Sequence, residues 1–367
     1  MSNFCKGTYV RIFLDCRMAY WSGVGRYTRD LVRALHELPD IEMTLACAPG
    51  DARVLDDNER VKNVEVAGSP LSFGGMQALA EAVERARPDL VHCLHFPTPW
   101  KCEVPLVVTL QDLTPLAVPG VMGWPKRVAY RWLNDRAVAK ATRIITPSDA
   151  TARDVLHFFP RSQGKIVAIA DAADDFSVGP VGQIPAGIPV HGKSYIFSMG
   201  NTKAHKDLPT LLDAFQRLAP NRAGLHLVLA GEEPKGYLDA RLSGEPRRRA
   251  HFTGPINDDQ LRALYAGATI FAFPSLYEGF GLPPLEAMAM GTPVVAADAA
   301  SVPEVVGDAA VLVPPQDARA LLAALAKLLD SEDRRKELAA AGLARARQFT
   351  WAHTAKLTAE VYAEVLR

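Results

Sequence analysis

Two glutamates eight positions apart, Glu278 and Glu286, have the spacing in this sequence best suited to chemistry. Between them lie the Gly-Phe-Gly segment 279–281 and the pair Pro283-Pro284. Glycine lets backbone N–H groups approach a ligand closely, and proline suits the first turn of a helix. The segment therefore predicts a strand, a glycine loop and a helix N-terminus, which together could hold an anion with a carboxylate on either side.

A purely structural role explains one of these two glutamates better than the other. Carboxylates can accept paired hydrogen bonds from vicinal diols, which ribose and hexoses both offer. We expect Glu286 in the first turn of a helix that Gly291 and Pro293 end, where an acid could also simply stabilise the helix. Glu278, beside glycine in an apolar loop, is harder to explain by structure alone.

A second group of polar residues follows the apolar segment 195–199. It begins at Gly200 and Asn201 and contains His205 and Lys206. Positive charge is needed where a diphosphate departs, because negative charge grows on it in the transition state. A solvated loop is the alternative when these residues are taken alone.

A third group, Gly23 and Gly25, follows the first apolar segment. These glycines could let the backbone meet a phosphate at the start of the next helix, or could form a tight turn only. Thr28 stands where a Gly-x-Gly-x-x-Gly fingerprint needs its third glycine, and no Gly-x-x-x-x-Gly-Lys-Ser/Thr segment occurs. Nicotinamide and P-loop interpretations are therefore weakened.

Apolar, β-branched segments alternate with amphipathic ones along both halves of the chain, which predicts an α/β protein with largely parallel sheets. Predicted strands are 9–14, 43–47, 64–66, 90–94, 105–110, 143–146, 195–199, 225–230, 250–253, 268–273, 292–296 and 310–313. Predicted helices include 25–38, 76–86, 208–218, 258–266, 318–329, 331–349 and 351–366. Residues 172–193 are rich in glycine and proline and predict a linker.

Ligands of open α/β sheets bind beyond the carboxyl ends of the strands. Two such domains that face each other would form an interdomain cleft, with one glycine-rich loop from each.

Composition narrows the function further. Forty-one Lys and Arg balance 41 Asp and Glu, which argues against nucleic acid as a partner because such binding needs a basic face. The five cysteines are scattered and predict reduced thiols. No signal peptide and no apolar segment of roughly 18 residues is evident, so we expect a cytoplasmic protein, peripheral to the membrane at most.

Together these motifs resemble glycosyltransferase family 4, and the resemblance covers nearly the whole chain. Further segments that match the family are Arg26-Tyr27, 90–93, 109–115, 146–148 and 301–307. The greatest likeness is to bacterial mannosyltransferases that act on polysaccharide or lipid-linked glycan.

The resemblance implies the GT-B fold, with two Rossmann-like domains facing an interdomain cleft. It implies an acceptor-binding domain (1–175), a linker (176–193), a nucleotide-sugar-binding domain (194–349) and a C-terminal helix (350–367) that returns to the first domain.

The resemblance also implies residue roles. Glu286 should bind the ribose, Glu278 the transferred sugar and Lys206 the diphosphate. The expected catalytic residues are Glu278, Lys206, Gln111 and Asp112. The expected donor-binding residues are Gly23, Gly25, Gly200, Asn201, His205, Lys206, Glu278, Gly279, Phe280, Gly281, Leu282 and Glu286.

Two residues depart from the family pattern. His205 stands where many relatives carry arginine, and Gln111-Asp112 stands where many carry His-Asp. Glutamine cannot transfer a proton, although it can still form hydrogen bonds. His95 could supply the missing imidazole; the alternative is a structural histidine with its hydrogen bonds satisfied.

No metal or cofactor is expected. His92 and His95 are spaced to point to opposite faces of a strand. The chain contains no Asp-x-Asp, the usual carboxylate grip on a divalent ion in the other main glycosyltransferase fold.

The helix that starts near Trp124 carries Lys126, Arg127, Arg131 and Trp132. Such a face could contact anionic lipid headgroups or a lipid-linked acceptor. The alternative is an ordinary surface helix with Trp132 in the core.

The expected function is a retaining, metal-independent transfer of a hexose, with mannose favoured, from a nucleoside-diphosphate sugar. GDP-mannose is the favoured donor, and the acceptor is a glycan, a lipid-linked glycan or a small molecule. A UDP-sugar-dependent transferase of the same family and a catalytically silent nucleotide-sugar-binding protein remain alternatives.

Overall fold

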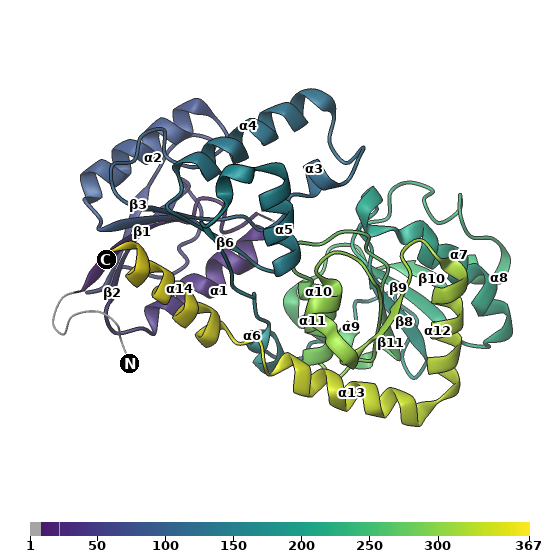
Figure 1. Ribbon diagram of the computed structural model, residues 1–367. Helices are drawn as coiled ribbons and strands as arrows, with labels where there is room; N and C mark the ends of the chain where they lie inside the picture. The colour runs from purple at the N-terminus through teal and green to yellow at the C-terminus, as the bar shows by residue number, and fades with distance from the viewer. Residues whose placement is uncertain (1–8, 22) are drawn as a thin grey trace. The chain divides into compact units, whose positions relative to one another are not determined.

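The computed structural model describes residues 9–21 and 23–367 and divides into two compact units (Figure 1). The first unit ends at Asp171 and also includes Trp351–Arg367, and the second is Ala172–Thr350. Cys5, one of the five cysteines, lies outside the described residues.

The first unit contains a seven-stranded parallel sheet in the order β3-β2-β1-β4-β5-β6-β7. Its strands are β1 (Val10–Asp15), β2 (Ile41–Cys47), β3 (Val61–Glu65), β4 (Leu90–Cys93), β5 (Leu106–Thr109), β6 (Arg143–Thr146) and β7 (Ile166–Ala168). Its helices are α1 (Val24–His36), α2 (Phe73–Ala86), α3 (Thr114–Ala117), α4 (Trp124–Lys140), α5 (Asp149–Phe158) and α14 (Trp351–Val365), with a 3₁₀ turn, η1 (Pro160–Ser162).

The second unit contains a six-stranded parallel sheet in the order β10-β9-β8-β11-β12-β13. Its strands are β8 (Tyr195–Met199), β9 (His226–Ala230), β10 (Ala250–Phe252), β11 (Ile270–Phe273), β12 (Val294–Ala297) and β13 (Val311–Val313). Its α-helices are α6 (Asp174–Val178), α7 (Leu208–Leu218), α8 (Gly244–Arg248), α9 (Asp258–Gly267), α10 (Leu282–Ala289), α11 (Val302–Val306), α12 (Ala318–Asp330) and α13 (Glu332–Ala346). Its 3₁₀ turns are η2 (Ala204–Lys206), η3 (Ala219–Asn221) and η4 (Gly307–Ala309).

The central strands form the core of each unit. Strands β4, β5 and β11 are buried along their whole length, as expected where helices cover both faces of a parallel sheet. The predicted Rossmann-like α/β class is confirmed for both units.

Each sheet has a point at which the strand order reverses. In the first unit the chain moves outward from β1 to β2 and β3, then returns to β4 on the other side of β1. In the second unit β8 and β11 stand in the same relation. In open α/β sheets, ligands bind at such a point, beyond the carboxyl ends of the strands.

The segment predicted as a linker has structure of its own. It contains α6 and packs on α9, where Arg262 Nε donates to the Pro180 carbonyl oxygen (2.8 Å). The Gly182 N–H donates to the Asp259 carbonyl oxygen (3.0 Å). These contacts place the segment within the second unit.

Helix α14 closes the first unit with a buried hydrogen-bond chain. The Tyr362 hydroxyl lies 2.6 Å from His92 Nδ1, and Thr109 Oγ1 lies 2.8 Å from His92 Nε2. Burial lowers the pKa of His92 to about 3, so the ring is neutral. His92 is therefore a structural residue that joins β4, β5 and α14.

Two further observations concern metals and membranes. Over the described residues, no three His, Cys, Asp or Glu side chains come together in a group that could hold a metal ion. In that same part of the chain, no helix combines the length and apolarity needed to cross a membrane.

Candidate active site

The polar groups that follow β8 and β11 meet at the switch point of the second unit. Lys206 Nζ, in η2, lies 2.6 Å from Glu278 Oε1, in the loop after β11. The Ser275 hydroxyl donates to the same oxygen (2.5 Å). The Leu276 N–H donates to the carbonyl oxygen of His205 (2.7 Å), which ties the two loops together.

The Lys206–Glu278 ion pair is partly shielded from water. Only 18% of the lysine side chain and 14% of the glutamate side chain are exposed. Each charge therefore neutralises the other. An anion that binds to Lys206 must share the positive charge of the lysine with Glu278. Sequence reasoning placed the two residues on different parts of a donor and missed their pairing.

The glycine loop between the two glutamates is held by Ser301. The Ser301 hydroxyl lies 2.9 Å from the carbonyl oxygen of Glu278 and 2.5 Å from that of Phe280. Gly281 has a φ of 122°, which only glycine adopts readily, and it caps α10 just before Leu282. Ser301 is a site residue that sequence reasoning had noted only as a family landmark.

Glu286 lies in the second turn of α10, because the helix begins at Leu282; its predicted place in the first turn was wrong. Its side chain is buried, and the Tyr265 hydroxyl donates to Oε2 (3.0 Å). The carboxylate is thus fixed in direction by a residue of α9.

Several residues after β8 have a role in the local structure. A Cβ atom at Gly200 would lie 2.7 Å from the Ala230 carbonyl oxygen, so close packing requires glycine there. Asn201 Oδ1 accepts from the Lys203 N–H (3.0 Å), which shapes the loop. The His205 ring is buried.

In the first unit, the two glycines after β1 have different explanations. A Cβ atom at Gly25 would lie 2.5 Å from the Ala19 carbonyl oxygen, which supports the tight-turn alternative for this residue. Gly23 has a φ of 83° and precedes α1, with open space where a Cβ atom would stand.

Two polar atoms at the adjacent ends of β4 and β5 are buried without a hydrogen-bond partner in the described part of the chain. They are His95 Nδ1 and Gln111 Nε2. Burial lowers the pKa of His95 to about 4, against opposing effects of Asp112 and Asp15. The two expectations for His95, a site imidazole or a structural histidine, both stay predictions, and a buried nitrogen of this kind needs an explanation.

Asp112, by contrast, serves the local structure. Its Oδ1 accepts from the Thr114 N–H (2.8 Å), and its carbonyl oxygen accepts from the Tyr130 hydroxyl (3.0 Å). The backbone between β5 and α4 is fixed in this way, and the neighbouring Gln111 side chain is held at the carboxyl edge.

Comparison with known proteins gives consistent results. Residues 184–345 match the family model for glycosyl transferases group 1, and residues 22–171 match the glycosyl transferase 4-like domain. The O-antigen chain mannosyltransferase B of Escherichia coli is 29% identical, over 93% of this chain and 96% of its own length.

Solved structures agree on the fold. Sucrose-phosphate synthase from Thermosynechococcus elongatus superposes with a TM-score of 0.77 at 21% identity, over 97% of this chain and 99% of its own. Anabaena HepE, solved in complex with UDP and glucose, gives a TM-score of 0.72 at 19% identity, over 97% and 100%.

Two Rossmann-like units, with an ion-paired lysine and glutamate at one switch point, define a glycosyltransferase of the GT-B fold. The chain belongs to glycosyltransferase family 4.

Proposed function

We propose that this protein transfers mannose from GDP-mannose to a glycan acceptor with retention of configuration and without a metal ion. The observation that carries the proposal is the Lys206–Glu278–Ser275 cluster at the β8–β11 switch point. Mannose is favoured because the Escherichia coli relative that aligns over nearly the whole chain is a mannosyltransferase.

The second unit contains the groups that this reaction needs. Lys206 would stabilise the diphosphate as negative charge develops on it. Glu278, oriented by Ser275, would accept hydrogen bonds from hydroxyls of the transferred sugar. Glu286, held by Tyr265, would accept them from the ribose diol.

The bonds and the proton of this transfer are all accounted for without a protein nucleophile. The bond from the anomeric carbon to the diphosphate oxygen breaks, and a bond from the same carbon to the acceptor oxygen forms on the same face. The acceptor proton passes to the departing diphosphate. Gln111 would therefore need only to hydrogen-bond, which its amide can do.

His95 would assist on the acceptor side. Its lowered pKa keeps the imidazole neutral near pH 7, so one ring nitrogen donates and the other accepts. Together with the Gln111 amide, it would position an acceptor hydroxyl at the carboxyl edge of β4 and β5.

The decisive experiment measures mannose transfer from GDP-mannose to a manno-oligosaccharide by the intact protein and by Glu278→Gln. We expect kcat/KM to fall by roughly 10²–10³-fold, as for other groups that stabilise a transition state. The matched control is Glu337→Gln, which removes an exposed ion pair on α13. Unchanged transfer by Glu278→Gln would refute the assignment.

The product and a chelator test the finer parts of the proposal. An α-linked product from the α-linked donor, assigned by NMR, would support retention, and a β-linked product would refute it. We expect EDTA to leave the rate unchanged; loss of transfer that Mg²⁺ or Mn²⁺ restores would overturn metal independence.

Thermal-shift measurements separate the alternatives for the donor. A ligand that binds the native state raises Tm by mass action. A larger shift with a UDP-sugar than with GDP-mannose would support the uridine donor. A shift without transfer or donor hydrolysis would support a catalytically silent protein.

A peripheral membrane contact through α4 belongs to the same proposal. Trp124, Val128 and Trp132 lie four residues apart on one helix face and are exposed (76%, 50% and 51%), so the expectation of a core Trp132 was wrong. Arg127 and Arg131 are exposed near them. This face would bind anionic headgroups.

Sedimentation with phosphatidylglycerol vesicles and with neutral phosphatidylcholine vesicles tests the α4 contact. We expect binding to the anionic vesicles only, and its loss in Trp124→Ser/Trp132→Ser. Equal sedimentation of this variant and the intact protein would refute a membrane role for α4.

A further inference from the structure

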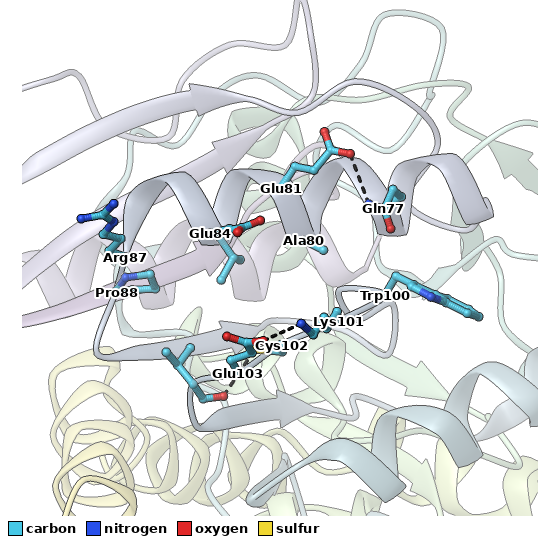
Figure 2. Close-up of a pocket in the computed structure, with 12 residues that line it drawn as sticks. Gln77, Ala80, Glu81, Glu84, Arg87, Pro88, Trp100, Lys101, Cys102 and Glu103 are labelled. Carbon is cyan, nitrogen blue, oxygen red and sulfur yellow. Dashed lines mark hydrogen bonds and ion pairs between the residues drawn. The ribbon is translucent and has the colours of Figure 1, made fainter.

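A groove of about 450 Å³ lies on the first unit, and none of the residues assigned to transfer lines it (Figure 2). One wall is α2, and the other is the segment from Trp100 to Val104 that leads into β5. The groove begins at Trp100 and extends to Arg87 and Pro88, just before β4.

Trp100 lines one end of this groove, and Phe73, which is not itself a lining residue, packs against it. Trp100 and Phe73 pack edge to face with ring centroids 4.6 Å apart, yet they stay 39% and 58% exposed. Arg136 lies over the Trp100 ring (4.9 Å) and donates to the carbonyl oxygens of Pro99 (2.6 Å) and Trp100 (2.8 Å). The aromatic pair is therefore held in place before any ligand arrives.

Carboxylate and amide groups line the rest. Gln77 donates to Glu81 (3.2 Å), and Glu84 lies one turn further along the same face of α2 (Figure 2). Lys101 pairs with Glu103 (2.5 Å) on the opposite wall. The lining thus offers many hydrogen-bonding oxygens and no excess of positive charge.

This lining favours one class of ligand. Three carboxylates against Arg87 and Lys101 disfavour phosphate or an anionic lipid. A peptide strand would need an open sheet edge, but β4 and β5 are interior strands. A neutral polyhydroxyl chain fits, because its C–H faces can stack on aromatic rings while its hydroxyls bond to carboxylates and amides.

We propose that this groove is a second glycan-binding site, which holds distant sugars of a growing acceptor chain. Its acceptor role rests on the proposed function. Trp100 follows His95 by five residues in the loop after β4, so the two lie within about 17 Å at 3.4 Å per residue. One oligosaccharide can span that distance and occupy both sites.

Calorimetry with manno-oligosaccharides and no donor tests binding. We expect a longer oligosaccharide to bind more tightly than mannobiose, and Phe73→Ala and Trp100→Ala each to weaken it by about tenfold or more. Tyr9→Ala, at an exposed aromatic residue outside the groove, is the matched control and should bind as the intact protein does. Equal affinity in Phe73→Ala, whose ring is mostly exposed, would overturn the proposal.

Cys102 supplies a second readout inside the groove. It is a free, half-buried thiol, whereas Cys16, Cys47 and Cys93 are buried. Bound oligosaccharide should slow alkylation at Cys102, measured by peptide mass spectrometry. Binding that leaves the Cys102 rate unchanged would place the sugar elsewhere and refute the groove.

The groove and the proposed function can fail separately. If the intact protein transfers no sugar from any nucleotide donor, the proposed function fails, while calorimetry and alkylation still test the groove. If transfer occurs, Phe73→Ala should raise KM for long acceptors with kcat unchanged, and should leave mannobiose kinetics unaltered. An unchanged KM for long acceptors would refute the groove.

Discussion

Lys206 and Glu278 are 72 residues apart in the sequence, and their pairing is the main feature of the candidate site. A lysine in a turn after a strand and a glutamate in a loop each have an ordinary structural explanation. Their ion pair, supported by Ser275, changes the interpretation because Lys206 can share its charge between a carboxylate and a phosphate.

Because Lys206 and Glu278 act as one unit, their substitutions should not be additive. We expect Lys206→Ala and Glu278→Gln each to lower kcat/KM by about 10²–10³-fold, and the double variant to lose little more. Steady-state kinetics of the four proteins in a double-mutant cycle give the coupling. Losses that multiply fully would show that the two residues act independently.

Glycines at the turns divide into those required by packing and those that are not. Packing requires Gly25, because a Cβ atom there would lie 2.5 Å from the Ala19 carbonyl oxygen, whereas Gly281 is required by its φ of 122°. Family resemblance assigned Gly25 to donor binding; its packing explains the residue without a donor.

Gly25→Ala should destabilise the protein by about 1–3 kcal/mol, since the added methyl group would lie 2.5 Å from a backbone oxygen. Chemical denaturation measures this change. The matched control is Gly74→Ala in α2, where, over the described residues, no atom outside the adjacent backbone lies within 4 Å of the new Cβ atom. That helix substitution should stabilise by about 0.5–1 kcal/mol, and equal effects at both positions would contradict the packing argument.

Most elements could be predicted because their patterns are local. The bounds of β6, β8 and α7 were predicted to the residue, since apolar runs and helical spacing depend on near neighbours. Strand β7 was missed, because it is three residues long, half-buried and at the edge of the sheet. The short helix α6 was missed among glycines and prolines.

The C-terminal helix completes the unit that the N-terminal part of the chain begins. Besides the Tyr362–His92 contact, Thr354 Oγ1 donates to the Ala170 carbonyl oxygen (2.8 Å). The sheet core of the first unit therefore depends on residues far along the chain.

Tyr362→Phe should destabilise the protein by about 1–3 kcal/mol, because it leaves His92 Nδ1 buried without a partner. The loss should appear in urea unfolding monitored by circular dichroism. Tyr9→Phe, at an exposed tyrosine of the same unit, is the control. A Tyr362→Phe protein as stable as the control would show that this hydrogen bond is dispensable.

Asp171 is the last residue of the first unit before the chain enters the second. Its buried carboxyl group should make the stability of the protein depend on pH. Burial, aided by Asp30, raises its pKa from 3.8 to about 8. Below pH 8 the carboxyl group is neutral in the folded state. Its contribution to the stability of the fold is therefore complete below pH 3.8 and is lost as the pH rises through 8.

Asp171→Asn should therefore gain stability over the intact protein as the pH rises from 4 to 8. Tm values measured across that range provide the test. The lowered pKa of His92 acts in the opposite direction, reducing stability as the pH falls below 6.5, and should affect both proteins alike. A Tm difference that stays constant with pH would contradict this account of Asp171.

The sequence by itself determined the α/β class, the order of elements, the family and the glutamate loop, because these depend on local periodicity and on motifs with fixed spacing. Only the tertiary structure decided which motifs meet. The order of strands in a parallel sheet brings together loops such as those of Lys206 and Glu278. It also places His95 and Gln111 at one edge, each with a nitrogen that finds no partner among the described residues. Long-range strand pairing sets such contacts, and no local pattern encodes it.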